Sequence, residues 1–119
     1  MNNVKEIIRK YADFTQIQTS KINFICDILE CFRGDFILLT PKECKKFKCY
    51  LTNIYNNVSL IQDIMYTCRD EIIDLLSRDN ISCIEYLKLS DIKINLNILA
   101  ENKCQHILEI ISKCISKII

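Results

Sequence analysis

The scarcity of glycine and proline, one of each in 119 residues, is the feature that most constrains the fold of this chain. Tight β-hairpins depend on glycine and on Asn-Gly or Asp-Gly turns, and neither dipeptide occurs here. Apolar residues instead recur at helical spacing almost throughout the chain. We therefore expect an all-α protein.

Capping residues and apolar stripes divide the chain into a series of expected helices. The clearest start is Thr40-Pro41-Lys42-Glu43, which combines a capping box with proline at the first helical position. Gly34 stands where the glycine that ends a helix is expected. The five longer expected helices cover residues 4–14, 20–32, 41–54, 59–77 and 104–118. Thr19 or Ser20 can cap the second of them, and Ser59 with Gln62 has the spacing of a capping box for the fourth. Two short helices are expected between residues 77 and 104, one after Ser82 with Glu85 and one after Ser90.

This division predicts a compact single domain over residues 1–119. Six or seven helices of this length do not make a simple four-helix bundle. The helix over residues 59–77 has apolar residues on most of its surface, so we expect it to be the central, most buried one. The other helices should pack around it.

Charge and hydropathy argue for an intracellular protein without nucleic-acid or membrane partners. The net charge is +1, which gives no electrostatic reason to expect nucleic acid or an anionic membrane. No segment approaches the roughly 20 apolar residues of a membrane span, and residues 1–10 lack the apolar core of a signal peptide. We expect a cytoplasmic location.

The eight cysteines raise the question of disulfides or metal binding. Most stand where a helix places an apolar residue, so we expect reduced thiols acting as small apolar side chains. Cys26–Cys31 and Cys44–Cys49 have four intervening residues each, so on a helix their sulfurs diverge. Cys104-Gln105-His106 is one further fragment of a metal site. We expect no metal and no cofactor.

Catalytic signatures are also missing from the sequence. His106 is the only histidine, and Gly34, the only glycine, cannot make a phosphate-binding loop. The adjacent carboxylates Asp70 and Glu71 are most simply explained by a solvent-exposed face of a helix. We expect a protein that is not an enzyme.

A candidate partner-binding site surrounds the predicted start of the helix at Pro41. The preceding segment from Asp35 to Leu39 has too many apolar residues for a solvated connection, Phe36 among them. These residues either fill the core or form a wall of a groove for a partner helix. The candidate binding residues are Phe36, Phe47, Tyr50 and Ile54, with Lys45 and Lys46 on the exposed face.

The segment from Val4 to Ile37, with VKEIIRKYADF followed by INFICDILECFRGDFI, resembles the opening of the poxviral apoptosis-inhibitor proteins of the B-cell-lymphoma-two-like fold. That resemblance implies a hydrophobic groove for an amphipathic helix of a pro-death protein, or other faces that block innate-immune adaptors. The family's tryptophan-containing motif is missing, since the chain has no tryptophan. We expect this chain to lack the C-terminal membrane anchor of that family.

A second set of segments resembles the death fold in its death-effector and pyrin branches. LTPKECKKFKCYL looks like the second helix of those domains, and DEIIDLLSRDNISCIEYLKL looks like their later helices. The resemblance covers about residues 22–110 and leaves the first expected helix without a counterpart. Both families are non-catalytic helical interaction domains.

The expected function is therefore a viral inhibitor of host apoptosis or innate-immune signalling. It would bind an amphipathic helix or an adaptor protein of the host or the virus, and homodimerisation stays open. The alternative is a small helical structural or assembly protein, or an inhibitor of a nucleic-acid-processing complex.

Overall fold

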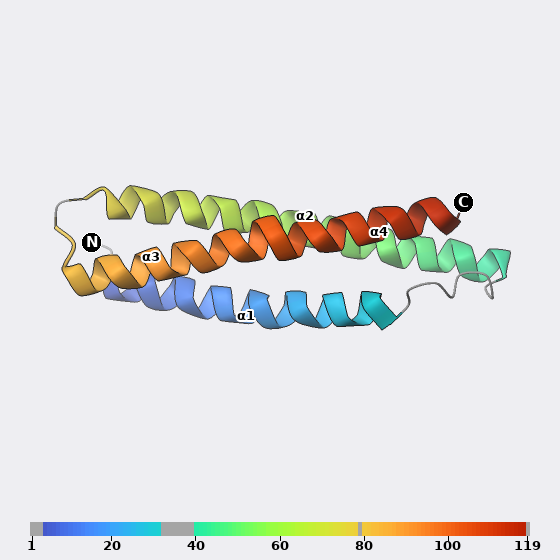
Figure 1. The fold of residues 1–119 in the computed structure, drawn as a ribbon, viewed down its shortest axis with the longest axis horizontal. Helices are drawn as coiled ribbons and strands as arrows, with labels where there is room; N and C mark the ends of the chain where they lie inside the picture. The colour runs from blue at the N-terminus through green and yellow to red at the C-terminus, as the bar shows by residue number, and fades with distance from the viewer. Residues whose placement is uncertain (1–3, 32–39, 79, 119) are drawn as a thin grey trace.

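The computed structural model describes residues 4–31, 40–78 and 80–118. They form three long helical segments that lie side by side in a rod of 61 × 20 × 18 Å (Figure 1). The first two are α1 (Val4–Cys31) and α2 (Pro41–Leu76). The third joins α3 (Cys83–Asn97), a π-helical segment η2 (Ile98–Cys104) and α4 (Gln105–Ile118). Neighbours along the chain run in opposite directions.

The all-α prediction is confirmed, since the described residues contain no strand. The prediction of six or seven helices in a compact bundle is wrong, because the described residues form three long helical segments in a rod. Residues 59–76 are the second half of α2, so no central helix is enclosed by the others. The three segments share one core between them.

The helix breaks expected at internal serine and threonine residues do not occur. Thr15 and Thr19 lie inside α1, where their hydroxyl groups donate to the carbonyl oxygens four residues earlier, of Tyr11 and Thr15, at 2.7 Å each. A hydroxyl bonded in this way stays within the helix and does not cap a new one. Ser59 likewise lies within α2. Gly34 falls outside the described residues.

Two capping boxes that the sequence predicted do begin helices. The Thr40 hydroxyl oxygen accepts a hydrogen bond from the Glu43 backbone N–H at 3.2 Å, while the Glu43 carboxylate accepts from the Thr40 N–H. The Ser82 and Glu85 pair makes the same two bonds at the start of α3. Each pair satisfies N–H groups that the first helical turn leaves without partners.

Regular seven-residue spacing of buried residues explains why α2 is one long helix. The α2 residues Leu51, Val58, Met65 and Ile72 are seven residues apart and at most 2% exposed. An apolar line with this period keeps facing its neighbours along the whole length of a helix, as in coiled coils. Tyr11, Ile22 and Leu29 extend the same core along α1.

In the third helical segment, the row of buried residues shifts by one position along the chain at η2. Leu89, Ile92, Leu96 and Leu99 follow helical spacing, which would next place Lys103 and His106 in the core. Leu99 and Ala100 are both buried, and the buried line continues one position later from Ala100 through Cys104, Ile107 and Ile111. A π-helical turn accommodates this extra residue. The side chain of Gln62 donates to the Ala100 carbonyl oxygen in η2 at 2.9 Å, so Gln62 bridges two helices and does not cap one.

Among the described residues, one polar group on the core-facing side of α1 has no hydrogen-bond partner. The Thr15 side chain is 8% exposed, but its hydroxyl group is satisfied within the helix. The Gln18 side-chain oxygen is buried and accepts no hydrogen bond from the described residues. A buried acceptor without a donor destabilises the folded state.

Candidate interaction surface

The residues predicted to bind a partner lie in the first half of α2, apart from Phe36, which falls outside the described residues. Phe47 and Ile54 are half-buried and pack against the core. Tyr50 is 67% exposed, and Lys45 and Lys46 are exposed as well. The structure therefore separates two core-facing residues from three that are accessible. Their part in partner binding stays a prediction.

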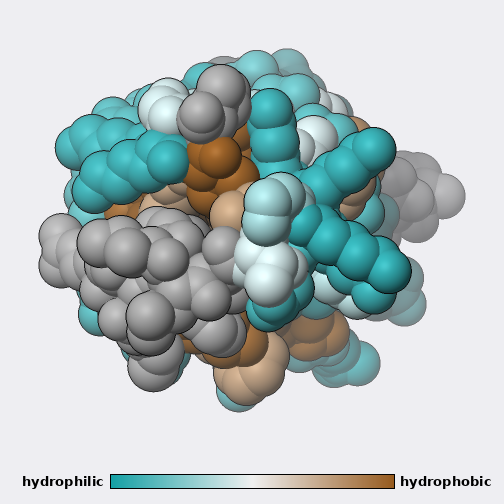
Figure 2. Space-filling view, turned by 90° about the vertical axis from the view of Figure 1, so that its right-hand side faces the viewer, coloured by the Kyte–Doolittle hydropathy of each residue, from teal (hydrophilic) through white to brown (hydrophobic). Residues whose placement is uncertain are grey.

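Figure 2 looks onto the end of the rod where α2 begins and α4 ends. Apolar side chains show near the centre of this end, between hydrophilic ones. Phe47 of α2 and Ile115 and Ile118 of α4 are among the half-buried apolar residues that pack on the core. The apolar interior therefore reaches this end of the rod.

The loosest contact between long helices lies between α1 and α2. α1 packs mainly on the third helical segment and touches α2 at few positions. A cleft of about 470 Å³ separates the two helices there. Its walls are Lys10, Tyr11 and Phe14 of α1 and Asp63, Ile64, Thr67, Cys68 and Glu71 of α2.

Exposed apolar residues continue the α1 wall of this cleft along the helix. Ile17, Phe24 and Ile28 are 61%, 65% and 37% exposed. They follow Phe14 with three-, seven- and four-residue steps, which place them on one side of a helix. The α1 wall is therefore apolar over several turns.

The α2 wall continues in the same way. Leu60 and Ile64, one turn apart, are 60% and 41% exposed. Tyr50 lies on the same line, since steps of three and four residues lead from it through Asn53 and Asn57 to Leu60. We call the cleft and these two lines the α1–α2 face. Its apolar residues are Phe14, Ile17, Phe24, Ile28, Tyr50, Leu60 and Ile64.

Charges of opposite sign border the two walls of the α1–α2 face. Exposed Lys10 and Lys21 share the line of Phe14 and Phe24 on α1. Exposed Asp63 and Glu71 belong to the α2 wall. At the cleft, the α1 wall is therefore basic and the α2 wall is acidic.

Sequence reasoning missed most of this face. The signal was present as a second line of apolar residues on α1, beside the one that enters the core. A single sequence does not reveal which of two apolar lines is buried. α3 shows the same ambiguity, because Ile84, Leu87 and Ile94 are 66%, 67% and 52% exposed whereas Leu89 and Ile92 are buried.

The thiols with shifted pKa values do not have the character of nucleophiles. Burial raises the pKa of Cys68, which lines the cleft, and raises that of Cys104 to about 11. Burial also raises the pKa of Cys26, with further contributions from the carboxylates of Glu30 and Asp27. Catalytic cysteines need the opposite shift, toward the thiolate.

Cys104 and His106, a metal-site fragment noted in the sequence, are separated in the fold. Cys104 is fully buried in the core, while His106 is exposed. Among the described cysteines, Cys49 and Cys83 are exposed, so the expectation of buried thiols does not extend to these two.

No described helix has the length and apolar content needed to cross a membrane. Comparison of the chain with protein-family models, with curated proteins and with solved structures found no match to any of them.

Proposed function

We propose that this chain is a non-enzymatic protein-interaction domain that binds an amphipathic helix of a partner protein along the α1–α2 face. The observation that carries the proposal is the combination of a cleft between two loosely packed helices with exposed apolar lines on both walls. A helix laid between α1 and α2 would complete a four-helix arrangement. Recognition of this kind uses apolar anchors spaced by three and four residues.

The energetic gain comes from apolar surface that the domain alone leaves in water. Ile17, Phe24 and Leu60 are each at least 60% exposed. Covering one such side chain is worth on the order of 1 kcal/mol before the costs of association. These gains have to exceed the entropic cost of association, so binding requires that several anchors are covered together.

The charges of the α1–α2 face define the partner further. Lys10 and Lys21 favour acidic residues on the edge of the partner helix that lies against α1. Asp63 and Glu71 favour basic residues on its other edge. The proposed partner is an amphipathic helix with one acidic and one basic edge, which also fixes its direction along the face.

The resemblance of residues 4–37 to poxviral apoptosis inhibitors supports a partner from host death or innate-immune signalling, in the cytosol of the host cell. A second candidate function is assembly with further copies, which the exposed residues Ile84, Leu87 and Ile94 on α3 favour. The two functions use different surfaces.

Two leucines with similar exposure separate these functions. Leu60 is 60% exposed on the α1–α2 face, and Leu87 is 67% exposed on α3. Helical peptides are selected from a display library against the full chain, and the enriched peptides are titrated against Leu60→Ser and Leu87→Ser. Circular dichroism and thermal melting verify that both variants fold.

We expect the enriched peptides to carry one acidic and one basic edge. Their affinity should fall at least about tenfold in Leu60→Ser, or about 1.4 kcal/mol, and stay nearly unchanged in Leu87→Ser. Peptides that bind Leu60→Ser as tightly as the wild type contradict the proposal. Sedimentation showing a dimer that Leu87→Ser dissociates would favour assembly.

A further inference from the structure

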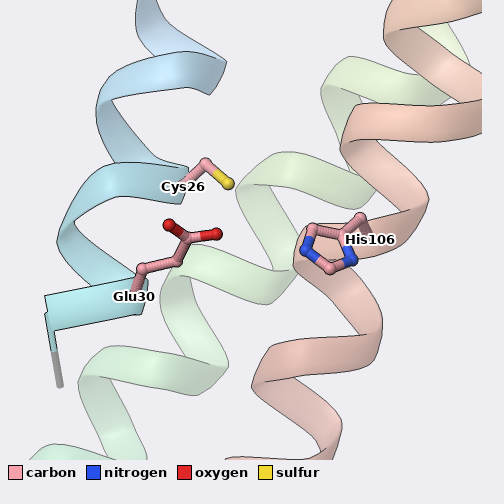
Figure 3. Close-up of side chains that lie close together, drawn as sticks. All are labelled: Cys26, Glu30 and His106. Carbon is pink, nitrogen blue, oxygen red and sulfur yellow. The ribbon is translucent and has the colours of Figure 1, made fainter. Parts of the chain in front are cut away.

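Three potential metal ligands that are far apart in the sequence meet between α1 and α4 (Figure 3). Cys26 and Glu30 lie one turn apart on α1, so their side chains project from the same side of that helix. His106 lies in the first turn of α4. The Cys26 sulfur, a Glu30 carboxylate oxygen and a ring nitrogen of His106 all lie within 4.8 Å of one another. Figure 3 shows the thiol and the carboxylate directed toward the imidazole ring.

The π-helical segment η2 determines where His106 points. If residues 98–104 were a regular α-helix, the line through Leu96 and Leu99 would continue through His106 into the core. The additional residue in η2 gives this position to Ile107, which is fully buried. His106 is left exposed beside the core, facing α1. π-helical turns interrupt α-helices frequently at functional sites.

We propose that Cys26, Glu30 and His106 bind a divalent transition-metal ion, and that zinc is the ion that suits this ligand set best. Zinc accepts thiolate sulfur, imidazole nitrogen and carboxylate oxygen together. Two negatively charged ligands neutralise its charge. Three protein ligands leave a fourth position for water or for a group from a bound partner.

The distances fit after small side-chain movements. Ligand atoms of tetrahedral zinc, with bonds of about 2.0–2.3 Å, lie roughly 3.3–3.8 Å apart. The three ligand atoms need to approach one another by at most about 1–1.5 Å, measured from the 4.8 Å limit on their present separation. Glu30 and His106 are exposed, so their side chains can rotate without disturbing the core.

Charges of both signs act on the Cys26 thiol, and the two carboxylates of Glu30 and Asp27 outnumber the one ammonium group of Lys103. Lys103 donates a hydrogen bond from its ammonium group to the Asn23 side-chain oxygen at 2.8 Å. Asn23 precedes Cys26 by almost one turn of α1. Asp27, whose carboxylate acts on the Cys26 thiol together with that of Glu30, adds negative charge near the site. These charges favour a metal cation between the helices.

The proposal departs from the sequence-based expectation that the chain binds no metal. That expectation considered ligands close together in the sequence, whereas residues 26 and 106 approach each other only in the folded chain. The site is separate from the α1–α2 face, so either proposal can fail without the other. A bound ion would link the C-terminal part of α1 to α4.

Binding of Co²⁺ tests the proposed metal site, because the absorption spectrum of Co²⁺ shows whether a thiolate is bound to it. Co²⁺ is titrated into the purified, reduced full chain and then displaced with Zn²⁺. The variants are Cys26→Ser, Glu30→Gln and His106→Gln, with Cys49→Ser as the control because Cys49 is an exposed cysteine on α2. Circular dichroism verifies that each variant is folded.

We expect one Co²⁺ per chain, with a thiolate-to-cobalt charge-transfer band and the strong visible bands of tetrahedral cobalt. The charge-transfer band should disappear in Cys26→Ser and persist in Cys49→Ser. His106→Gln and Glu30→Gln should each weaken binding at least about tenfold. Zinc should raise Tm by about 5 °C or more in the wild type and leave Cys26→Ser unchanged. A spectrum without the thiolate band, or a band that survives in Cys26→Ser, overturns the proposal.

Discussion

Deleting Asn102 should leave the fold intact, because the third helical segment contains one residue more than a regular α-helix needs. Asn102 is exposed and lies within η2. Its removal places Cys104 four residues after Leu99, which is the spacing that the core line of an α-helix requires. The fully buried residues Ile107 and Ile111 then keep their places.

The expected change in stability is small because its terms oppose each other. The hydrogen bond from Gln62 to the Ala100 carbonyl oxygen is at risk, and its loss costs about 1 kcal/mol. A regular α-helical turn in place of η2 recovers backbone hydrogen bonds with better geometry. We therefore expect the free energy of unfolding to stay within about 1 kcal/mol of the wild type.

Deleting Glu109 is the matched control, because this exposed residue lies within regular α4. Its removal rotates the rest of α4 by about 100° and brings Ser112 to the buried place of Ile111. The lost apolar burial and the new polar group should together cost about 3–5 kcal/mol.

Urea denaturation followed by circular dichroism measures both variants. Equal destabilisation by the two deletions would refute the argument that η2 corrects the phase of the core line. A larger loss for the Asn102 deletion would refute it as well.

Three further predictions follow from single groups. Gln18→Leu should raise the free energy of unfolding by about 1–2 kcal/mol, because it removes a buried oxygen without a donor; a lower urea midpoint would show that this oxygen is satisfied. The folded protein holds the Cys104 proton more tightly than the unfolded chain does, since burial raises the pKa of that thiol from 9.0 to about 11. The contribution of this thiol to the free energy of unfolding is complete below pH 9 and should fall by about 2–3 kcal/mol as the pH rises toward 11. Thermal melts at alkaline pH should therefore show a weaker dependence of stability on pH in Cys104→Ala than in the wild type. Thr40→Ala should cost about 1 kcal/mol through the lost cap, whereas Thr52→Ala, inside α2, should be nearly neutral in the same denaturation assay.

Local chemistry in the sequence predicts the true helix starts but also suggests false ones. Thr40 with Glu43 and Ser82 with Glu85 cap helices as predicted. Ser59 has Gln62 at the same spacing but lies inside α2. A capping box only lowers the cost of starting a helix where the chain must turn. The core line of α2 continues from Leu51 through Val58 to Met65, and continuous burial favours one long helix.

The candidate sites depend on tertiary arrangement that a single sequence does not contain. Tyr50 was predicted as part of a groove wall at the start of the helix that begins at Pro41, and the structure places it on the line of Leu60 along α2. Phe24 and Leu60 were not identified, because only the loose packing between α1 and α2 leaves them unburied. The approach of His106 to Cys26 depends on η2, whose extra residue looked in the sequence like a break between helices.

The loose contact between α1 and α2 has a consequence for the order in which the protein folds and opens. α2 and the third helical segment form a long hairpin whose halves pack closely, so this hairpin can assemble before α1 docks. Local unfolding should follow the reverse order, since segments with fewer buried contacts open at lower free energy. Amide hydrogens of α1 would then exchange with solvent before those of α2, and a helix bound between the two would slow that exchange.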